Sequence, residues 1–86
     1  MNTISKDEAL KLVRERLDAH QPREYRLDVV PDQTHEEDGW WIVSVAASRN
    51  DIRRYDYYDI LAQVEREIED ATNAQISLIP AHANAA

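Results

Sequence analysis

The sequence has no cysteine and a single glycine, Gly39. Without cysteine the chain has no disulfide bond, no thiolate ligand for a metal ion and no thiol nucleophile. One glycine is too few for the glycine-rich loops that cradle phosphate groups. No segment approaches the ~18 consecutive apolar residues of a membrane span. These absences exclude several enzyme classes and predict no membrane contact.

Positive charge is also scarce, because seventeen acidic residues stand against ten basic ones and the net charge is −7. A negative field disfavours nucleic acid and anionic lipid as partners and accommodates a basic or neutral one. The N-terminal stretch "MNTISKDEALKLV" lacks the basic and continuous apolar regions of a signal peptide. We therefore expect a cytoplasmic protein.

The length and the balance of residue types favour one folded domain. Hydrophobic residues make up 43% of the chain and charged residues 31%, as in globular proteins. Eighty-six residues bury one modest core. We expect a single domain over residues 1–80 and a frayed tail, "AHANAA", over residues 81–86.

The first helix is predicted from its capping residues and its apolar stripe. Ser5 and Glu8 fit a capping box, in which the serine hydroxyl accepts from the glutamate amide. The helix should end near Ala19 or His20, because Pro22 disfavours helical geometry in the residue before it. The stripe consists of Ala9, Leu10, Val13 and Leu17.

A second helix is predicted from about Asp56 to Thr72. Asp56 suits the N-cap, and Asn73 suits a left-handed C-cap. Its apolar stripe consists of Tyr57, Ile60, Leu61, Val64, Ile68 and Ala71.

Alternating or apolar runs predict three strands, at residues 24–30, 40–48 and 75–79, with a polar loop over residues 32–39. The predicted fold is therefore α+β: a two-layer sandwich in the order helix–strand–strand–helix–strand, with both helices on one face of a three-stranded sheet. This order resembles a ferredoxin-type fold without its first strand. The helix and tryptophan-bearing hairpin of residues 5–48 also resemble PepSY modules and some small bacterial immunity proteins. No residue motif carries a function over from either, so no family is assigned.

The adjacent pair Trp40 and Trp41 is the most informative local feature. Neighbouring strand residues point to opposite faces, so both indoles cannot enter one core. Val43 and Val45 place Trp41 inward and Trp40 outward. We expect Val30 to pair across from Trp40, which puts Asp28 opposite Ile42 and Arg26 opposite Ser44. The outward apolar side chains then form an interaction surface, unless a loop or the tail covers them: Val30, Trp40, Ile42 and Ile79.

The segment "SRNDIRRYDYYDI", residues 48–60, has two interpretations. One is a nucleic-acid contact, with Tyr55 or Tyr58 stacked on a base and three arginines on phosphates: Arg49, Arg53 and Arg54. The alternative is a helix start whose charges balance locally and whose Tyr57 enters the core. The neutralising residues would be Asp51, Asp56 and Asp59.

Catalytic and metal-binding patterns are weak. The run "HEED" at residues 35–38 lacks the alternating ligand spacing of a calcium loop, and we interpret it as a solvated hairpin loop. No serine or threonine has a histidine at a spacing that indicates a nucleophile with its general base. We expect no catalytic residue, no cofactor and no metal.

The first functional hypothesis is thus a non-catalytic protein-interaction module, such as a regulator, inhibitor or adaptor. It would use the open sheet face or an edge strand to bind a protein partner or a second copy of itself. The alternative is a nucleic-acid-binding accessory protein that uses the arginine–tyrosine segment.

Overall fold

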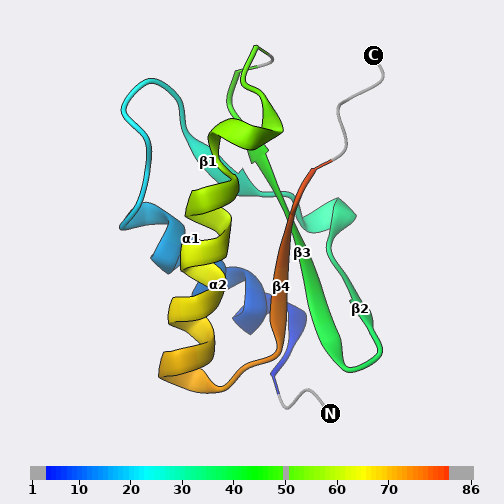
Figure 1. Cartoon of the computed structure of the whole chain (residues 1–86). Coiled ribbons are helices and arrows are strands. Elements are labelled where there is room, and N and C mark those ends of the chain that lie inside the picture. Colours follow the sequence, from blue (N-terminus) through cyan, green and yellow to red (C-terminus); the bar gives the residue numbers. More distant parts are fainter. Residues whose placement is uncertain (1–3, 50, 82–86) are drawn as a thin grey trace.

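A computed structural model describes residues 4–49 and 51–81 and confirms the α+β class, with four strands in this part of the chain where three were predicted (Figure 1). Two short 3-10 turns, η1 and η2, interrupt the chain between the regular elements. In order, the elements are α1 (Lys6–Asp18), β1 (Leu27–Val29), η1 (Pro31–Gln33), β2 (His35–Glu37), β3 (Trp40–Ala47), η2 (Arg54–Asp56), α2 (Tyr58–Thr72) and β4 (Ile76–Pro80).

Strand β3 is the centre of the sheet. Strands β1 and β2 pair with it antiparallel, and β4 pairs with it in parallel after the crossover through α2. Val45 pairs with both Val29 and Pro80, which places β1 and β4 on opposite sides of β3. Strand β2 lies on the β1 side, because β4 already pairs with the segment of β3 that β2 contacts.

The fourth strand corrects the predicted polar loop at residues 32–39. His35–Glu37 form β2, which is joined to β3 by a two-residue turn. Asp38 and Gly39 both have positive φ, 53° and 84°, as the turn type that matches the twist of a hairpin requires. The polar segment is therefore a turn, a short strand and a tight hairpin connection.

The predicted pairing of the first strand is also wrong in register. Asp28 pairs with Ala46 rather than with Ile42, and the Val30 N–H donates to the Ser44 carbonyl at 2.8 Å. The place opposite Trp40 belongs to Glu37 of β2. The polar segment occupies the position that was assigned to the first strand.

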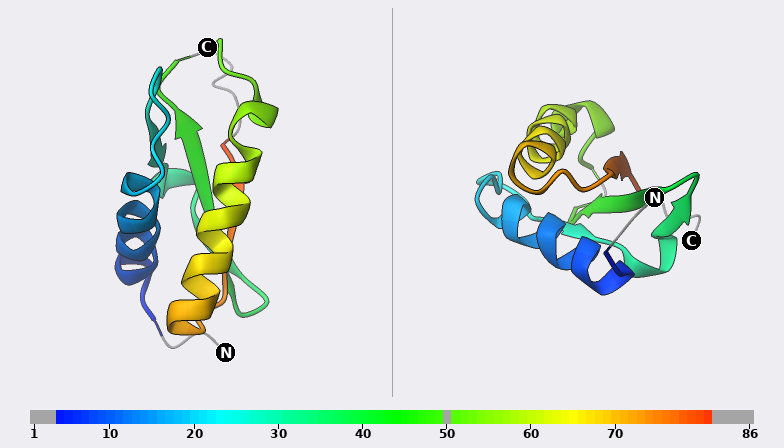
Figure 2. Two further views of the ribbon diagram at one scale, coloured as in Figure 1. Left: turned by 60° about the vertical axis from the view of Figure 1, so that its left-hand side comes forward. Right: turned by 90° about the horizontal axis from the view of Figure 1, so that it is seen from below.

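Both helices pack on one face of the sheet, as predicted (Figure 2). The side chains at the odd-numbered positions of β3 point toward the helices, and those of Val43 and Val45 are fully buried. Trp41 packs against this core while half-buried. The other buried apolar residues are Ala9, Leu10, Val13 and Leu17 of α1; Leu27 and Val29 of β1; Tyr57, Leu61, Val64 and Ile68; and Ile76 and Leu78 of β4.

The helix ends follow their capping residues closely. The Glu8 N–H donates to Ser5 Oγ at 3.2 Å, and α1 ends at Asp18 with Ala19 as its C-cap. Asn73 ends α2 in the left-handed conformation, with φ of 58°. These three predictions are confirmed.

The start of α2 differs from the prediction. The helix begins at Tyr58 with Tyr57 as N-cap, and no side chain caps it. The Asp56 carboxylate instead accepts from the Arg53 N–H at 3.0 Å, while the Asp56 N–H donates to the Arg53 carbonyl at 3.0 Å. Asp56 therefore closes η2, the turn before the helix.

The two helices are joined by an ion-pair cluster centred on Glu67. Its carboxylate lies 2.7 Å from His20 Nε2 and 3.5 Å from Arg16 Nη1. This cluster links the C-terminal end of α1 to the middle of α2.

Candidate interaction surface

The sheet face turned away from the helices carries the exposed tryptophan. Trp40 is 40% exposed, and Ile42 follows it on the same face of β3. Ile79 pairs with Ser44 and therefore lies diagonally across from Ile42. Both isoleucines are partly exposed. We call this group, Trp40, Ile42 and Ile79, the Trp40 surface.

The fourth residue of the predicted surface, Val30, flanks Ser44 on the side of β3 opposite Ile79, and like Ile79 it is far along β3 from Trp40. It sits opposite Ser44, four residues along β3 from Trp40, or about 13 Å at the rise of a strand. Between them η1 covers the face: Ser44 is 1% exposed, and its hydroxyl donates to the Gln33 carbonyl at 2.9 Å. In Figure 1 this turn and β2 lie on the side of β3 away from the helices. The chain thus covers the middle of the face itself.

Carboxylates border the Trp40 surface. Glu37 pairs directly with Trp40, Asp38 is in the adjoining turn and Asp32 is in η1, all of them exposed. His35 pairs with Ile42, and its Nε2 lies 3.4 Å from a Glu37 carboxylate oxygen. Residues 27–48, which include β1, η1, β2 and β3, contain no lysine or arginine. The strand β4 contains none either, so no lysine or arginine lies in the sheet.

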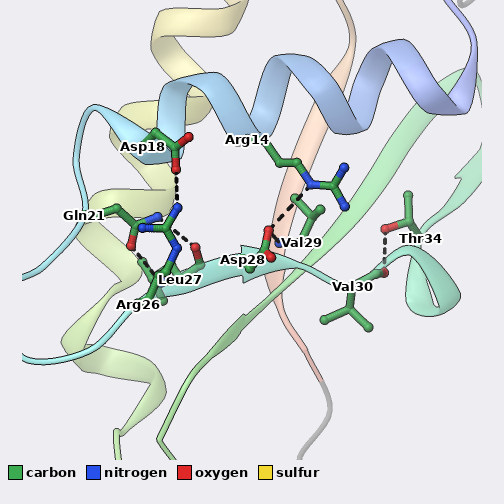
Figure 3. A network of polar contacts seen from close by, with 9 residues as sticks. All are labelled: Arg14, Asp18, Gln21, Arg26, Leu27, Asp28, Val29, Val30 and Thr34. Carbon is green, nitrogen blue, oxygen red and sulfur yellow. Dashed lines mark hydrogen bonds and ion pairs between the residues drawn. The ribbon is translucent and has the colours of Figure 1, made fainter.

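The free edge of β1 is closed by side chains (Figure 3). Gln21 accepts from the Leu27 N–H through Oε1 and donates to the Leu27 carbonyl through Nε2, both at 2.8 Å. It satisfies the groups that a neighbouring strand would pair with. The Asp28 carboxylate accepts from the Val29 N–H at 2.8 Å and lies 3.6 Å from Arg14 Nε. Another chain cannot add to β1 without displacing these contacts.

The free edge of β4 faces one acceptor on α2. The Leu78 backbone N–H donates a hydrogen bond to the Glu65 carboxylate of α2. Burial raises the pKa of Glu65 above its ordinary value, Glu69 adds to this effect, and the hydrogen bond from Leu78 opposes it. Pro80 ends the strand and has no N–H to donate. The outer edges of β1 and β4 are therefore poor templates for strand addition.

The arginine–tyrosine segment lies around η2, at the other end of β3 from Trp40. Arg49 is engaged by Asp51, with Nε–Oδ1 and Nη2–Oδ2 distances of 3.0 and 2.6 Å. Tyr57 is buried as predicted, whereas Tyr55 and Tyr58 are 80% and 47% exposed. Their ring centroids lie 6.3 Å apart at an interplanar angle of 47°. The side chain of Arg54 lies outside the described residues, so its predicted role is not placed.

The described residues contain no group of three or more histidine, cysteine, aspartate or glutamate side chains arranged to hold a metal ion. No helix in this part of the chain is long and apolar enough to cross a membrane. The "HEED" run contributes to β2 and its hairpin turn.

The sequence matches no protein-family model, and no curated protein or solved structure shows significant similarity to it. Function must therefore be argued from the surfaces themselves.

Sequence reasoning identified the apolar members of the Trp40 surface but missed its acidic border. His35 and Glu37 were assigned to a loop, and only their pairing with β3 brings them beside Ile42 and Trp40. The dipeptide Asp38–Gly39, which favours a two-residue hairpin, was the available signal.

Proposed function

We propose that this chain is a non-catalytic protein-interaction module that binds its partner through the Trp40 surface. The observation that carries this proposal is the position of Trp40 among partly exposed isoleucines on a sheet face that the helices leave open. Aromatic residues at the centre of an apolar patch dominate the energy of many protein interfaces. The contacts on the outer edges of β1 and β4 favour binding on the face over strand addition to these two strands.

A second candidate function is nucleic-acid binding through Arg49, Arg53, Arg54 and Tyr58. The exposed pair of Tyr55 and Tyr58 favours it, because aromatic rings can stack on bases. The contact between Arg49 and Asp51 opposes it, because a phosphate would have to compete with a carboxylate already in place. The net charge of −7 opposes it as well.

Affinity capture with three baits distinguishes the two functions. The baits are the wild type, Trp40→Ala, and a Tyr55→Ala/Tyr58→Ala variant that removes exposed aromatic area at the other end of the molecule. Each captured protein is then purified and its affinity for the three baits is measured directly, with nuclease present.

The proposal expects a direct complex with the wild type and the tyrosine variant that Trp40→Ala weakens by about tenfold or more. A complex that survives Trp40→Ala but depends on the tyrosines, or that nuclease abolishes, would support the second candidate instead.

A further inference from the structure

We infer that the partner of the Trp40 surface is a foreign protein segment with an apolar centre and a lysine- or arginine-rich border, and not a second copy of this chain. This inference rests on the proposed function and adds to it the chemistry of the partner.

The first argument is the one-sided charge of the sheet. All ten lysines and arginines lie in residues 1–26 and 49–70, in the helices and the segments beside them. On the outward face Glu37 pairs with Trp40 and lies next to His35; Asp38 is in the adjoining turn and Asp32 is in η1, both of them exposed. Interfaces pair complementary potentials, and like charges across an interface are strongly disfavoured. The border therefore selects cationic side chains on the partner.

The second argument concerns self-association. A symmetric dimer places the same patch on both sides of the interface. Two copies meeting through the Trp40 surface would bring Glu37 and Asp38 of each chain against the same acidic border of the other. No lysine or arginine of β1, β2, β3 or β4 is available to neutralise that contact. A cationic partner meets no such opposition.

The test uses three synthetic peptides of equal length, about eighteen residues, as defined probes. The first is an amphipathic Leu/Lys helix, with a leucine face bordered by lysines. The second has the same leucine face with glutamate in place of lysine. The third is oligolysine, which carries the charge without the apolar face. Binding to the full chain is measured by calorimetry at low and moderate salt, and circular dichroism verifies that each variant is folded.

Four variants, one of them a control, locate the binding site. Trp40→Ala removes the apolar anchor, and Asp32→Lys/Glu37→Lys reverses the border. Glu15→Lys/Asp70→Lys is the matched control, because it makes the same change in net charge at exposed positions on the two helices. A neutral variant, Glu37→Gln/Asp38→Asn, tests the border again while keeping a favourable hairpin turn.

The inference expects the Leu/Lys peptide to bind most tightly. Its affinity should fall about tenfold or more in Trp40→Ala and in the border reversal, and by a smaller factor in the neutral variant. The helix control should change it by less than about threefold.

Other outcomes distinguish failure of the inferred partner chemistry from failure of the proposed function. Equal, Trp40-dependent binding of the Leu/Glu peptide would overturn the partner chemistry and leave the proposed function standing. Binding of the Leu/Lys peptide that ignores Trp40, or equal binding of oligolysine, would overturn both. Sedimentation showing a wild-type dimer that Trp40→Ala dissociates would overturn the exclusion of a second copy.

Discussion

Two adjacent tryptophans occupy very different environments because strand side chains alternate between faces. Trp41 packs against the core, and its Nε1–H donates to the Ile4 carbonyl at 3.1 Å. Trp40 points to the other face and is 40% exposed. Trp41 therefore supports the fold, whereas the neighbouring Trp40 presents its side chain to solvent.

Trp41→Ala should lower the free energy of unfolding by about 3 kcal/mol, toward the low end for aromatic-to-alanine changes because Trp41 is only half-buried. Trp40→Ala should cost about 1 kcal/mol, since less apolar area leaves a packed environment. Urea unfolding of the wild type and both variants measures the difference. A larger loss for Trp40→Ala than for Trp41→Ala would mean that β3 faces the opposite way.

Glu65 should make stability depend on pH. Its raised pKa means that the folded state holds the proton more tightly than the unfolded state does. Its contribution to the free energy of unfolding therefore falls as pH rises from 4.5, the ordinary value, through the raised pKa of the folded state. Above that pKa the penalty is constant.

Glu65→Gln should remove this dependence while its amide oxygen still accepts from the Leu78 N–H. The variant should therefore gain stability relative to the wild type as pH rises through that interval. Urea unfolding at a series of pH values measures the difference between the two proteins. If the difference in free energy of unfolding stays constant, or if the variant becomes less stable relative to the wild type as pH rises, the assigned environment of Glu65 is contradicted.

At the scale of elements, side chains rather than strands complete the sheet. Gln21 closes β1, Glu65 closes β4 and η1 covers the centre of the outward face. Each of these contacts satisfies backbone or hydroxyl groups that would otherwise be left for a neighbouring chain. The covered part of the face is thereby centred on Ser44 of β3.

Gln21→Ala should cost about 1–3 kcal/mol, because the backbone groups of the buried Leu27 lose two hydrogen bonds. The matched control is Gln63→Ala, an exposed glutamine on α2, which should change stability by less than about 0.5 kcal/mol. Urea unfolding measures both. Equal effects from the two substitutions would show that Gln21 does not support β1.

Much of this fold is predictable from periodicity. Both helices, β3 and β4 were expected near their observed bounds, because apolar stripes and alternation report directly which face is buried. β2 was missed because its three residues are all polar and exposed, which leaves no apolar alternation to detect. The Gln21–Leu27 contact depends on how the intervening loop folds, and no local pattern encodes that path.

The candidate site was predictable to the same extent. The outward direction of Trp40 and Ile42 follows from alternation along one strand. The position of Val30 depends on pairing between strands. The sequence predicts a hairpin in which Val30 lies opposite Trp40, but in the structure Glu37 of β2 occupies that place. The acidic border was hidden for the same reason.

At the scale of the whole molecule, charge and shape divide the protein into two sides. Every lysine and arginine belongs to the helices or the segments beside them, and the strands supply apolar, acidic and polar side chains, with His35 of β2 among them. On the outward face, the Trp40 surface is where an incoming protein meets partly exposed apolar side chains of the sheet. A cationic partner would approach this side preferentially, and added salt should slow its association.

The most direct test of this account is residue-by-residue NMR mapping of the Leu/Lys peptide on the wild-type protein. Saturable shifts should concentrate on the Trp40 indole N–H and on the amides of Ile42 and Ile79, and the signals of Tyr55 and Tyr58 should stay in place. Shifts that centre on the two tyrosines while Trp40 is unmoved would contradict it.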